Sequence, residues 1–168
     1  MSLFTDFLIT LINRETEDIP QGMVCKIDSF DAQKMTADVI PLLQNKTKDG
    51  ETIDIGKLQK IPVAFMYCGD YYIKPEYKKD NLVWVSFSSF DYSNALKGEK
   101  APIDDVKFSL SYAIVTHGIL KDGDSAPTNK SGLVIGYQDS YIQLDENDIN
   151  INISGTVNIN NGNLEVSS

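Results

Sequence analysis

The closing stretch of the chain, residues 148–168, reads DININISGTVNINNGNLEVSS and alternates between apolar and small polar side chains. Because side chains two apart in a strand share a face, this alternation predicts strands with one apolar and one polar face. A helix is excluded, since the same spacing would place apolar groups all around it, and asparagine and β-branched residues are poor helix formers. Ser154-Gly155 and Asn161-Gly162 interrupt the alternation and predict turns or bulges between very short strands.

The overall composition is that of a folded chain with an acidic surface. The chain has 168 residues, of which 42% are hydrophobic and 23% charged, enough for one domain plus an extension. We find no apolar run long enough to cross a membrane and no secretory signal at the N-terminus. The formal net charge of −9 argues against nucleic acid as a partner. Cys25 and Cys68 both stand in apolar, strand-like contexts, which predicts buried, reduced thiols and synthesis in a cytoplasm.

Residues 1–18 are predicted to form a short amphipathic helix. Apolar residues recur at helical spacing, Ser2 is a suitable N-cap, and Asp6 lies near the positive end of the helix dipole. Two interpretations remain open: the helix packs on its own domain, or it is an arm that binds a partner or another copy. The candidate partner-binding residues are Phe4, Phe7, Leu8 and Leu11.

Residues 19–97 have the pattern of a small β domain. Apolar or alternating runs at 22–30, 34–43, 60–67 and 81–90 predict four strands, with weaker strands in the polar stretch 43–59. So many strands in so short a segment indicate a small barrel or sandwich, because closure removes exposed edges. The predicted barrel core consists of Val24, Val39, Val63, Val83, Val85 and Phe87.

The remaining residues divide into a connector and a tail. Residues 98–131 are predicted to be a connector or collar, and their last part, 119–131, has the Asp, Gly, Pro and Ser content of a linker. Residues 89–96 are predicted to hold one helical turn. The tail is predicted over 132–168, because the alternation extends upstream through Val134, Tyr141, Ile142 and Leu144.

Several motifs between residues 20 and 118 resemble a known family, the barrel domain of the central baseplate spike of contractile-tailed bacteriophages and related contractile particles. Lys79-Asp80-Asn81 stands where the family has a Lys-Gly-Asp turn, and Asn81 is expected to adopt the left-handed conformation that a glycine would supply. The residues that match the family pattern are Gly22, Val24, Ala37, Val39, Pro41, Leu42, Val83, Val85, Phe87, Asp91, Phe108, Leu110 and Ala113.

The resemblance implies a mainly β fold with three parts: a short N-terminal helix, a five-stranded OB-type barrel, and a C-terminal intertwined trimeric β-helix. Physical chemistry also favours partners for the tail, because isolated two-stranded ribbons are marginal in water. Burying its seven apolar side chains against two other copies would contribute about 10 kcal/mol per chain, comparable with a domain's net stability. The predicted trimer core of this spike consists of Ile149, Ile151, Ile153, Val157, Ile159, Leu164 and Val166.

Candidate catalytic and metal-binding residues are better explained as structural. His117 is the only histidine, and no Gly-x-Ser-x-Gly elbow accompanies it. Residues 122–124, Asp-Gly-Asp, lack the spacing of a calcium loop, and Glu99, Asp104 and Asp105 have the pattern of a solvated polar loop. Neither cysteine belongs to a Cys-x-x-Cys motif. We therefore expect no enzymatic activity, no metal and no cofactor.

The C-terminus departs from the family in one respect. Many spikes of this family end in a His-x-His pair whose three copies bind iron, whereas this chain ends in Leu-Glu-Val-Ser-Ser. We therefore carry no iron site over to this chain. The tip is expected to be free of metal or covered by a separate tip protein.

The expected function is that of a structural, membrane-puncturing spike at the distal end of a contractile tail tube. It would assemble in the bacterial cytoplasm as a homotrimer, contact tail-tube and baseplate hub proteins, and transmit contraction force to the target cell envelope. Whether the particle is a phage, a phage-tail-like bacteriocin or another contractile system stays open. The alternative is an OB-type carbohydrate-binding module oligomerised by its tail, with a sugar site at Tyr67, Tyr71, Tyr72 and Tyr77.

Overall fold

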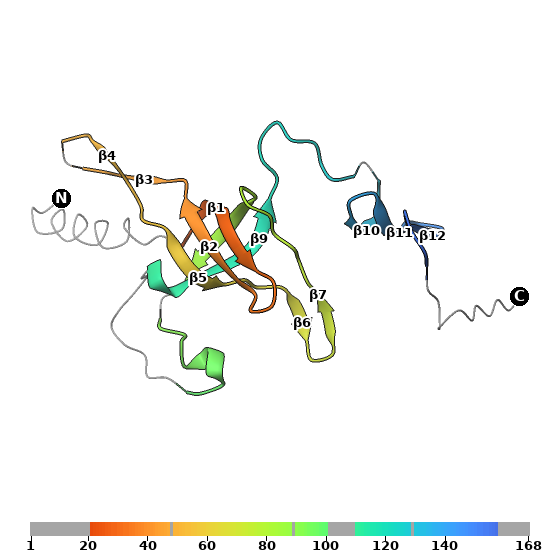
Figure 1. Cartoon of the computed structure of the whole chain (residues 1–168), viewed down its shortest axis with the longest axis horizontal. Helices are drawn as coiled ribbons and strands as arrows, with labels where there is room; N and C mark the ends of the chain where they lie inside the picture. The colour runs from red at the N-terminus through yellow and green to blue at the C-terminus, as the bar shows by residue number, and fades with distance from the viewer. Residues whose placement is uncertain (1–20, 48, 89, 101–109, 129, 158–168) are drawn as a thin grey trace, which may run out of the picture. The chain divides into compact units, whose positions relative to one another are not determined.

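The computed structural model describes residues 21–47, 49–88, 90–100, 110–128 and 130–157 (Figure 1). It divides into two compact units, Met1–Lys121 and Asp122–Ser168. The helix predicted over 1–18, with Phe4, Phe7, Leu8 and Leu11, lies outside the described residues. The fold is mainly β, as predicted.

The first unit is built on a curled five-stranded sheet with antiparallel neighbours and the order β5-β2-β1-β8-β9. Beyond the end of β5, Val63 forms an isolated parallel bridge with Val115 of β9, and the Ala64 amide donates a 2.8 Å hydrogen bond to the Val115 carbonyl. This bridge joins the two outer strands and gives the sheet its half-barrel form (Figure 1). The strands are β1 (Gly22–Asp31), β2 (Thr36–Pro41), β5 (Leu58–Pro62), β8 (Leu82–Phe87) and β9 (Ala113–Ile119).

The sheet extends beyond the range 19–97 that the sequence predicted for the barrel. Strand β9 lies within the predicted connector 98–131, but it pairs along its length with β8. Its burial pattern explains this pairing, because Ala113 and Val115 point into the core. The linker character predicted for the end of the connector begins only after Ile119.

The core of the half-barrel consists of alternate residues from its strands. Five of the six predicted core residues, Val39, Val63, Val83, Val85 and Phe87, are buried. The sixth, Val24, needs correction: it is only half-buried and lies opposite Trp84 on the outer face. Strand periodicity places it there, since it shares a face with Lys26 and Asp28, whereas Met23, Cys25 and Ile27 are buried.

Two hairpins stand out from the sheet at opposite ends of β5 (Figure 1). The first pairs β3 (Gln44–Lys46) with β4 (Thr52–Asp54) and precedes β5, in the stretch predicted to hold weak strands. The second pairs β6 (Met66–Cys68) with β7 (Tyr71–Ile73) and follows β5. The predicted helical turn is the 3-10 helix η1 (Ala95–Lys97), and a second one, η2 (Leu110–Tyr112), precedes β9.

The turn before β8 contains a residue in the left-handed backbone conformation, but at a different position from the one predicted. Asp80 has φ +67°, whereas Asn81 is not among the described residues with positive φ. The Asn81 side chain instead accepts a 2.7 Å hydrogen bond from the Lys78 amide. Asn81 therefore contributes its side chain, and Asp80 takes the conformation that glycine would supply.

The second unit contains a three-stranded antiparallel sheet in the order β10-β11-β12. Its strands are β10 (Leu133–Tyr137), β11 (Ser140–Leu144) and β12 (Ile149–Asn152). The period-two alternation of the tail therefore forms strands as far as Asn152, and residues 153–157, which include the interruption at Ser154-Gly155, belong to no strand.

Candidate interaction surface

The three-stranded sheet carries a block of aliphatic side chains on one face. Residues that are directly opposite in antiparallel strands point to the same side of the sheet. The register therefore aligns two rows across the three strands, with β11 in the middle. The aliphatic face, as we call it, consists of Leu133, Leu144 and Ile149 in one row and Ile135, Ile142 and Ile151 in the next.

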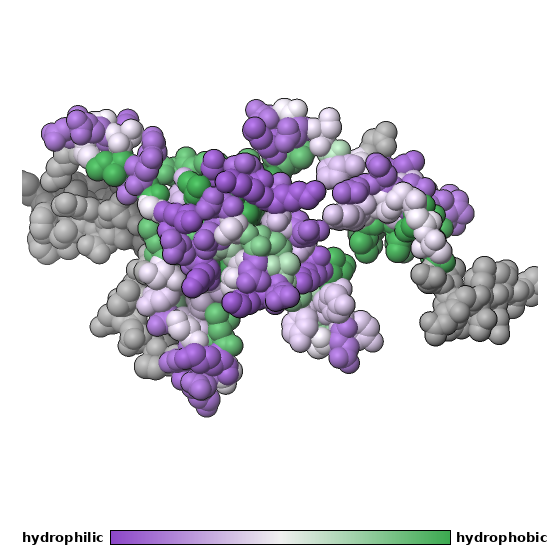
Figure 2. All heavy atoms as spheres, viewed as in Figure 1, coloured by the Kyte–Doolittle hydropathy of each residue, from purple (hydrophilic) through white to green (hydrophobic). Residues whose placement is uncertain are grey.

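All six side chains of the aliphatic face are exposed in the single chain. Their exposed fractions run from 40% for Ile142 and Leu144 to 68% for Ile149. Figure 2 shows apolar atoms gathered on one side of this unit. Scattered apolar residues are normal on protein surfaces, but a contiguous aliphatic block across three strands marks an interaction surface.

The opposite face of the same sheet is more polar. Its rows are Val134, Gln143 and Asn150, then Gly136, Tyr141 and Asn152. The alternation predicted that Val134 and Tyr141 share a set with Ile142 and Leu144, but the register places the two pairs on opposite faces. Both Val134 and Tyr141 are half-buried, and they line a shallow hollow together with the linker residues Pro127 and Thr128.

Polar groups hold the edges and turns of this sheet in place. The buried Gln143 side chain donates a 2.9 Å hydrogen bond to the Ser131 carbonyl. Asp145 accepts hydrogen bonds from the amides of Asn147 and Asp148, which forms the turn between β11 and β12. Gly132 has φ +77°, and a Cβ there would lie 2.2 Å from the Leu144 carbonyl oxygen. The register that aligns the aliphatic rows is therefore fixed by local contacts.

Four of the seven predicted trimer-core residues lie in the described part of the tail. Ile149, Ile151, Ile153 and Val157 are all exposed. The other three, Ile159, Leu164 and Val166, lie outside the described residues. Sequence periodicity found this set but missed Leu133 and Ile135 on β10, whose alternation is broken by the intervening Val134 and Gly136.

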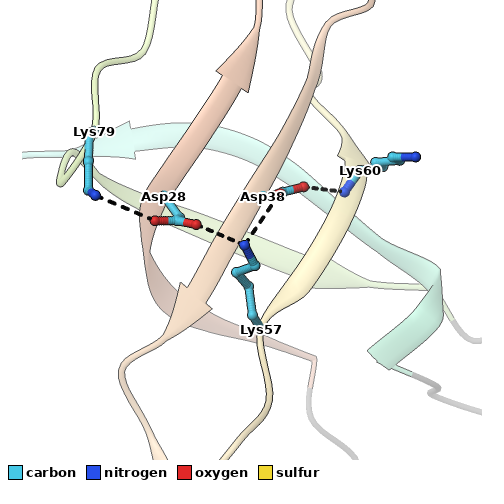
Figure 3. A network of polar contacts seen from close by, with 5 residues as sticks. All are labelled: Asp28, Asp38, Lys57, Lys60 and Lys79. Carbon is cyan, nitrogen blue, oxygen red and sulfur yellow. Dashed lines mark hydrogen bonds and ion pairs between the residues drawn. The ribbon is translucent and has the colours of Figure 1, made fainter.

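A polar cluster lies on the outer face of the half-barrel, where β1, β2 and β5 run side by side (Figure 3). Lys57 Nζ donates a 2.9 Å hydrogen bond to Asp28 Oδ2 and lies 3.5 Å from Asp38 Oδ2. Asp38 also accepts a 2.8 Å hydrogen bond from the amide of Lys60, which has φ +54°. Lys79 Nζ lies 3.8 Å from the other oxygen of Asp28.

This cluster stands where the strand pairing is irregular. The register shifts between Ile27 and Ser29, which makes Asp28 the extra residue of a bulge. A second shift leaves two residues of β5, Gln59 and Lys60, opposite Asp38. Bulges bend a strand and increase its twist. The hydrogen bond from Lys57 holds the pKa of Asp28 below its usual value, and the bond from the Lys60 amide does the same for the pKa of Asp38. The cluster therefore joins three strands at the positions where two register shifts interrupt their pairing.

The candidate catalytic residues are dispersed. His117 is exposed on β9 with its Nδ1 3.0 Å from the hydroxyl of Thr116, and no acid lies against it among the contacts described. Residues 122–124 form an exposed turn, Glu99 is exposed, and Asp104 and Asp105 lie outside the described residues. Within the described ranges, no three His, Cys, Asp or Glu side chains gather as metal ligands would. No helix in those ranges has the length and apolarity needed to span a membrane.

The two cysteines differ in burial. Cys25 is buried in the core as predicted, and its burial raises the pKa of the thiol to about 11. Cys68 is exposed on the β6–β7 hairpin, which corrects the prediction that it is buried. Its apolar neighbours suggested burial, but those neighbours are themselves exposed, because the ribbon leaves the sheet.

The four tyrosines of the predicted sugar site differ in their surroundings. Tyr67, Tyr71 and Tyr72 are 65–81% exposed on the β6–β7 hairpin. Tyr77 is half-buried, and its ring meets the Phe30 ring edge-on at a centroid distance of 5.6 Å. Burial raises the pKa of Tyr77. Its role is therefore packing against the half-barrel.

A curled antiparallel half-barrel, followed in the chain by a short sheet with an exposed aliphatic face, defines a mainly β class of protein. The family comparison is more specific. Residues 23–118 match the family described as phage protein Gp138 N-terminal domain, and the chain belongs to this family. The match covers the half-barrel from β1 to β9 and ends before the linker. No curated protein matches the chain.

Proposed function

We propose that this chain is the structural central spike of a contractile tail and acts as a homotrimer that transmits contraction force to a target cell envelope. Membership of a phage protein family supports a structural role in a phage particle. The observation that carries the finer proposal is the aliphatic face, which leaves six large side chains exposed on one short sheet.

Three copies of this sheet can cover each other's aliphatic faces around a common axis. The exposed side chains of Asn150 and Asn152 on the opposite face would then lie on the outer wall of the needle, in contact with water. Ile149 and Ile151 belong to this face, and Ile153 and Val157, which follow β12, are exposed as well. An interlocked tail gives a high barrier to unfolding, which suits a part that bears load.

The half-barrel is proposed to be an OB-type barrel that attaches the spike to the particle. Its five strands and its partial closure through Val63 and Val115 agree with a small, partly open barrel. Tail-tube and hub proteins are the proposed partners of this end, at the distal end of the tail tube, and the helix predicted over 1–18 is a candidate contact. A structural role, with no catalysis and no cofactor, is part of the proposal.

Light scattering on the purified chain tests the proposal directly. A homotrimer has three times the chain mass of 18.7 kDa. Deletion of residues 132–168 should lower the resistance of the assembly to heat and SDS, because it removes the aliphatic face. A stable monomer at working concentration would refute the spike function. Tight binding in an oligosaccharide panel would instead favour the carbohydrate-binding alternative.

A further inference from the structure

The β6–β7 hairpin exposes an unusual amount of apolar and aromatic surface. Tyr67, Tyr71 and Tyr72 have exposed fractions of 65%, 81% and 67%, and Met66 is 70% exposed. Cross-strand pairing places Tyr67 with Tyr72 on one side of the ribbon, and Cys68 with Tyr71 on the other. Both sides of the ribbon are therefore apolar, whereas a ribbon that only covers its own domain would need one polar side.

The composition of this hairpin is that of a protein interface. Tyrosine and methionine are enriched in the centres of interfaces, and charged residues are depleted. Between Ala64 and Ile73 the only charged residue is Asp70, at the tip of the turn. At roughly 200 Å² for each buried aromatic residue, the three tyrosines alone would bury about 400 Å². This is about half of what one partner contributes to an interface of standard size.

A second apolar patch lies on the other hairpin. Leu42 and Leu43 lead into β3, and Ile53 lies on β4; these three side chains are 47%, 55% and 55% exposed. Figure 2 shows apolar atoms at the root of this arm. The two hairpins leave opposite ends of β5, which has five residues, so roughly 16 Å of strand separates them.

We propose that the β6–β7 hairpin of one copy docks on the Leu42–Leu43–Ile53 patch of the next copy, so that the half-barrels form a closed head-to-tail ring. Different patches at opposite ends of one strand make a heterologous contact, and such contacts generate rings when the rotation closes. This inference rests on the proposed trimer and adds to it a second interface, separate from the aliphatic face of the tail. It assigns the exposed tyrosines to assembly.

The native thiol of Cys68 provides the test. It is exposed on the docking hairpin, whereas Cys25 is buried, so a thiol-reactive crosslinker reaches only Cys68 in the folded wild-type chain. The variant Leu43→Cys adds a second reactive thiol on the receiving patch. Treatment of the full chain with a short bismaleimide, followed by a denaturing gel, should then give covalent dimers and trimers.

Two controls accompany this experiment. Lys97→Cys places a thiol on the exposed helix η1, outside both patches, and should give no ladder. Leu43→Cys combined with Cys68→Ser should give none either, because each interface then has only one thiol. As a second readout, Tyr71→Asp should lower the yield of crosslinked trimer at least fivefold in the Leu43→Cys background, without changing the circular dichroism of the chain.

The outcomes separate this inference from the proposed function. A trimer by light scattering that gives no ladder with Leu43→Cys would overturn the ring while leaving the spike intact. A dimer of wild-type chains joined through Cys68 alone would indicate a two-fold contact and would also overturn it. A crosslink confined to one chain would show that the hairpins meet within a copy, which contradicts the proposal. A monomer by light scattering would refute both.

Discussion

Replacing Ile142 by asparagine should dissociate the proposed trimer. Ile142 lies in the middle strand of the aliphatic face, between Ile135 and Ile151, and is 40% exposed in the single chain. Full burial of an isoleucine is worth about 1.5–3 kcal/mol, so covering its exposed part contributes roughly 1 kcal/mol. The unpaired amide that replaces it costs about 1–3 kcal/mol more when buried.

Because the proposed trimer contains three copies of residue 142, the substitution lowers its association free energy three times over. At roughly 2–4 kcal/mol per chain, the trimer loses about 6–12 kcal/mol, and each 1.4 kcal/mol corresponds to a tenfold change in an equilibrium constant. The trimer formation constant should therefore fall by about four orders of magnitude or more. Light scattering over a dilution series measures this fall.

The matched control for this experiment is Val134→Asn. It makes the same kind of substitution in the adjacent strand, with the same loss of β propensity, but on the opposite face of the sheet. It should leave the association unchanged. Normal association of Ile142→Asn, or equal dissociation of both variants, would refute the assignment of the aliphatic face to the interface.

Three further predictions concern the half-barrel. Gly22→Ala should destabilise the fold by about 1–3 kcal/mol in chemical denaturation, because its Cβ would lie 2.7 Å from the Trp84 ring; an unchanged midpoint would contradict this packing. The pKa values of Asp28 and Asp38 are lowered in the folded state, so their contribution to stability is present above the unfolded value near 3.8 and is lost as the pH falls through the folded values. Lys57→Met should therefore reduce the loss of stability in acid, as measured by denaturation at pH 6 and pH 3, and an identical pH dependence would argue against the cluster. Cys68 should react with a thiol reagent at once and Cys25 only on unfolding, since burial raises the pKa of Cys25 to about 11; two equally fast thiols would show that the core is open.

The alternation of polar and apolar residues predicted most of the strands and five of the six core residues. It failed for Val24, because residues 23–25, Met-Val-Cys, are all apolar and do not show which of the two sets of alternate residues is buried. Only the polar Lys26 and Asp28 indicate that the set containing Val24 lies on the outer face. It failed for Cys68 for another reason. An apolar run predicts burial only if the strand joins a sheet with a covered face, and the β6–β7 ribbon leaves the sheet.

Register was the other quantity that local patterns did not determine. Tyr141 and Ile142 are adjacent in β11, so strand periodicity alone places them on opposite faces. The face of Val134 relative to β11 could be known only from the pairing of β10 with β11, which depends on the turn at Gln138 with its φ of +53°. Strand β9 was missed as a barrel strand because its partner β8 lies far away in sequence, and no turn signal links the two. Long-range pairing of this kind is set by the shape of the core.

In a single chain, β10 and β12 are the outer strands of the described three-stranded sheet, and each has one row of backbone groups without a partner strand in it. Unpaired strand edges beside an apolar face are a template for aggregation. In the proposed trimer, the two neighbouring copies must therefore pair with a newly made tail before unrelated chains do. Synthesis of several copies on one messenger would keep those neighbours close, so the yield of soluble protein should depend on how the chains are produced as well as on their sequence.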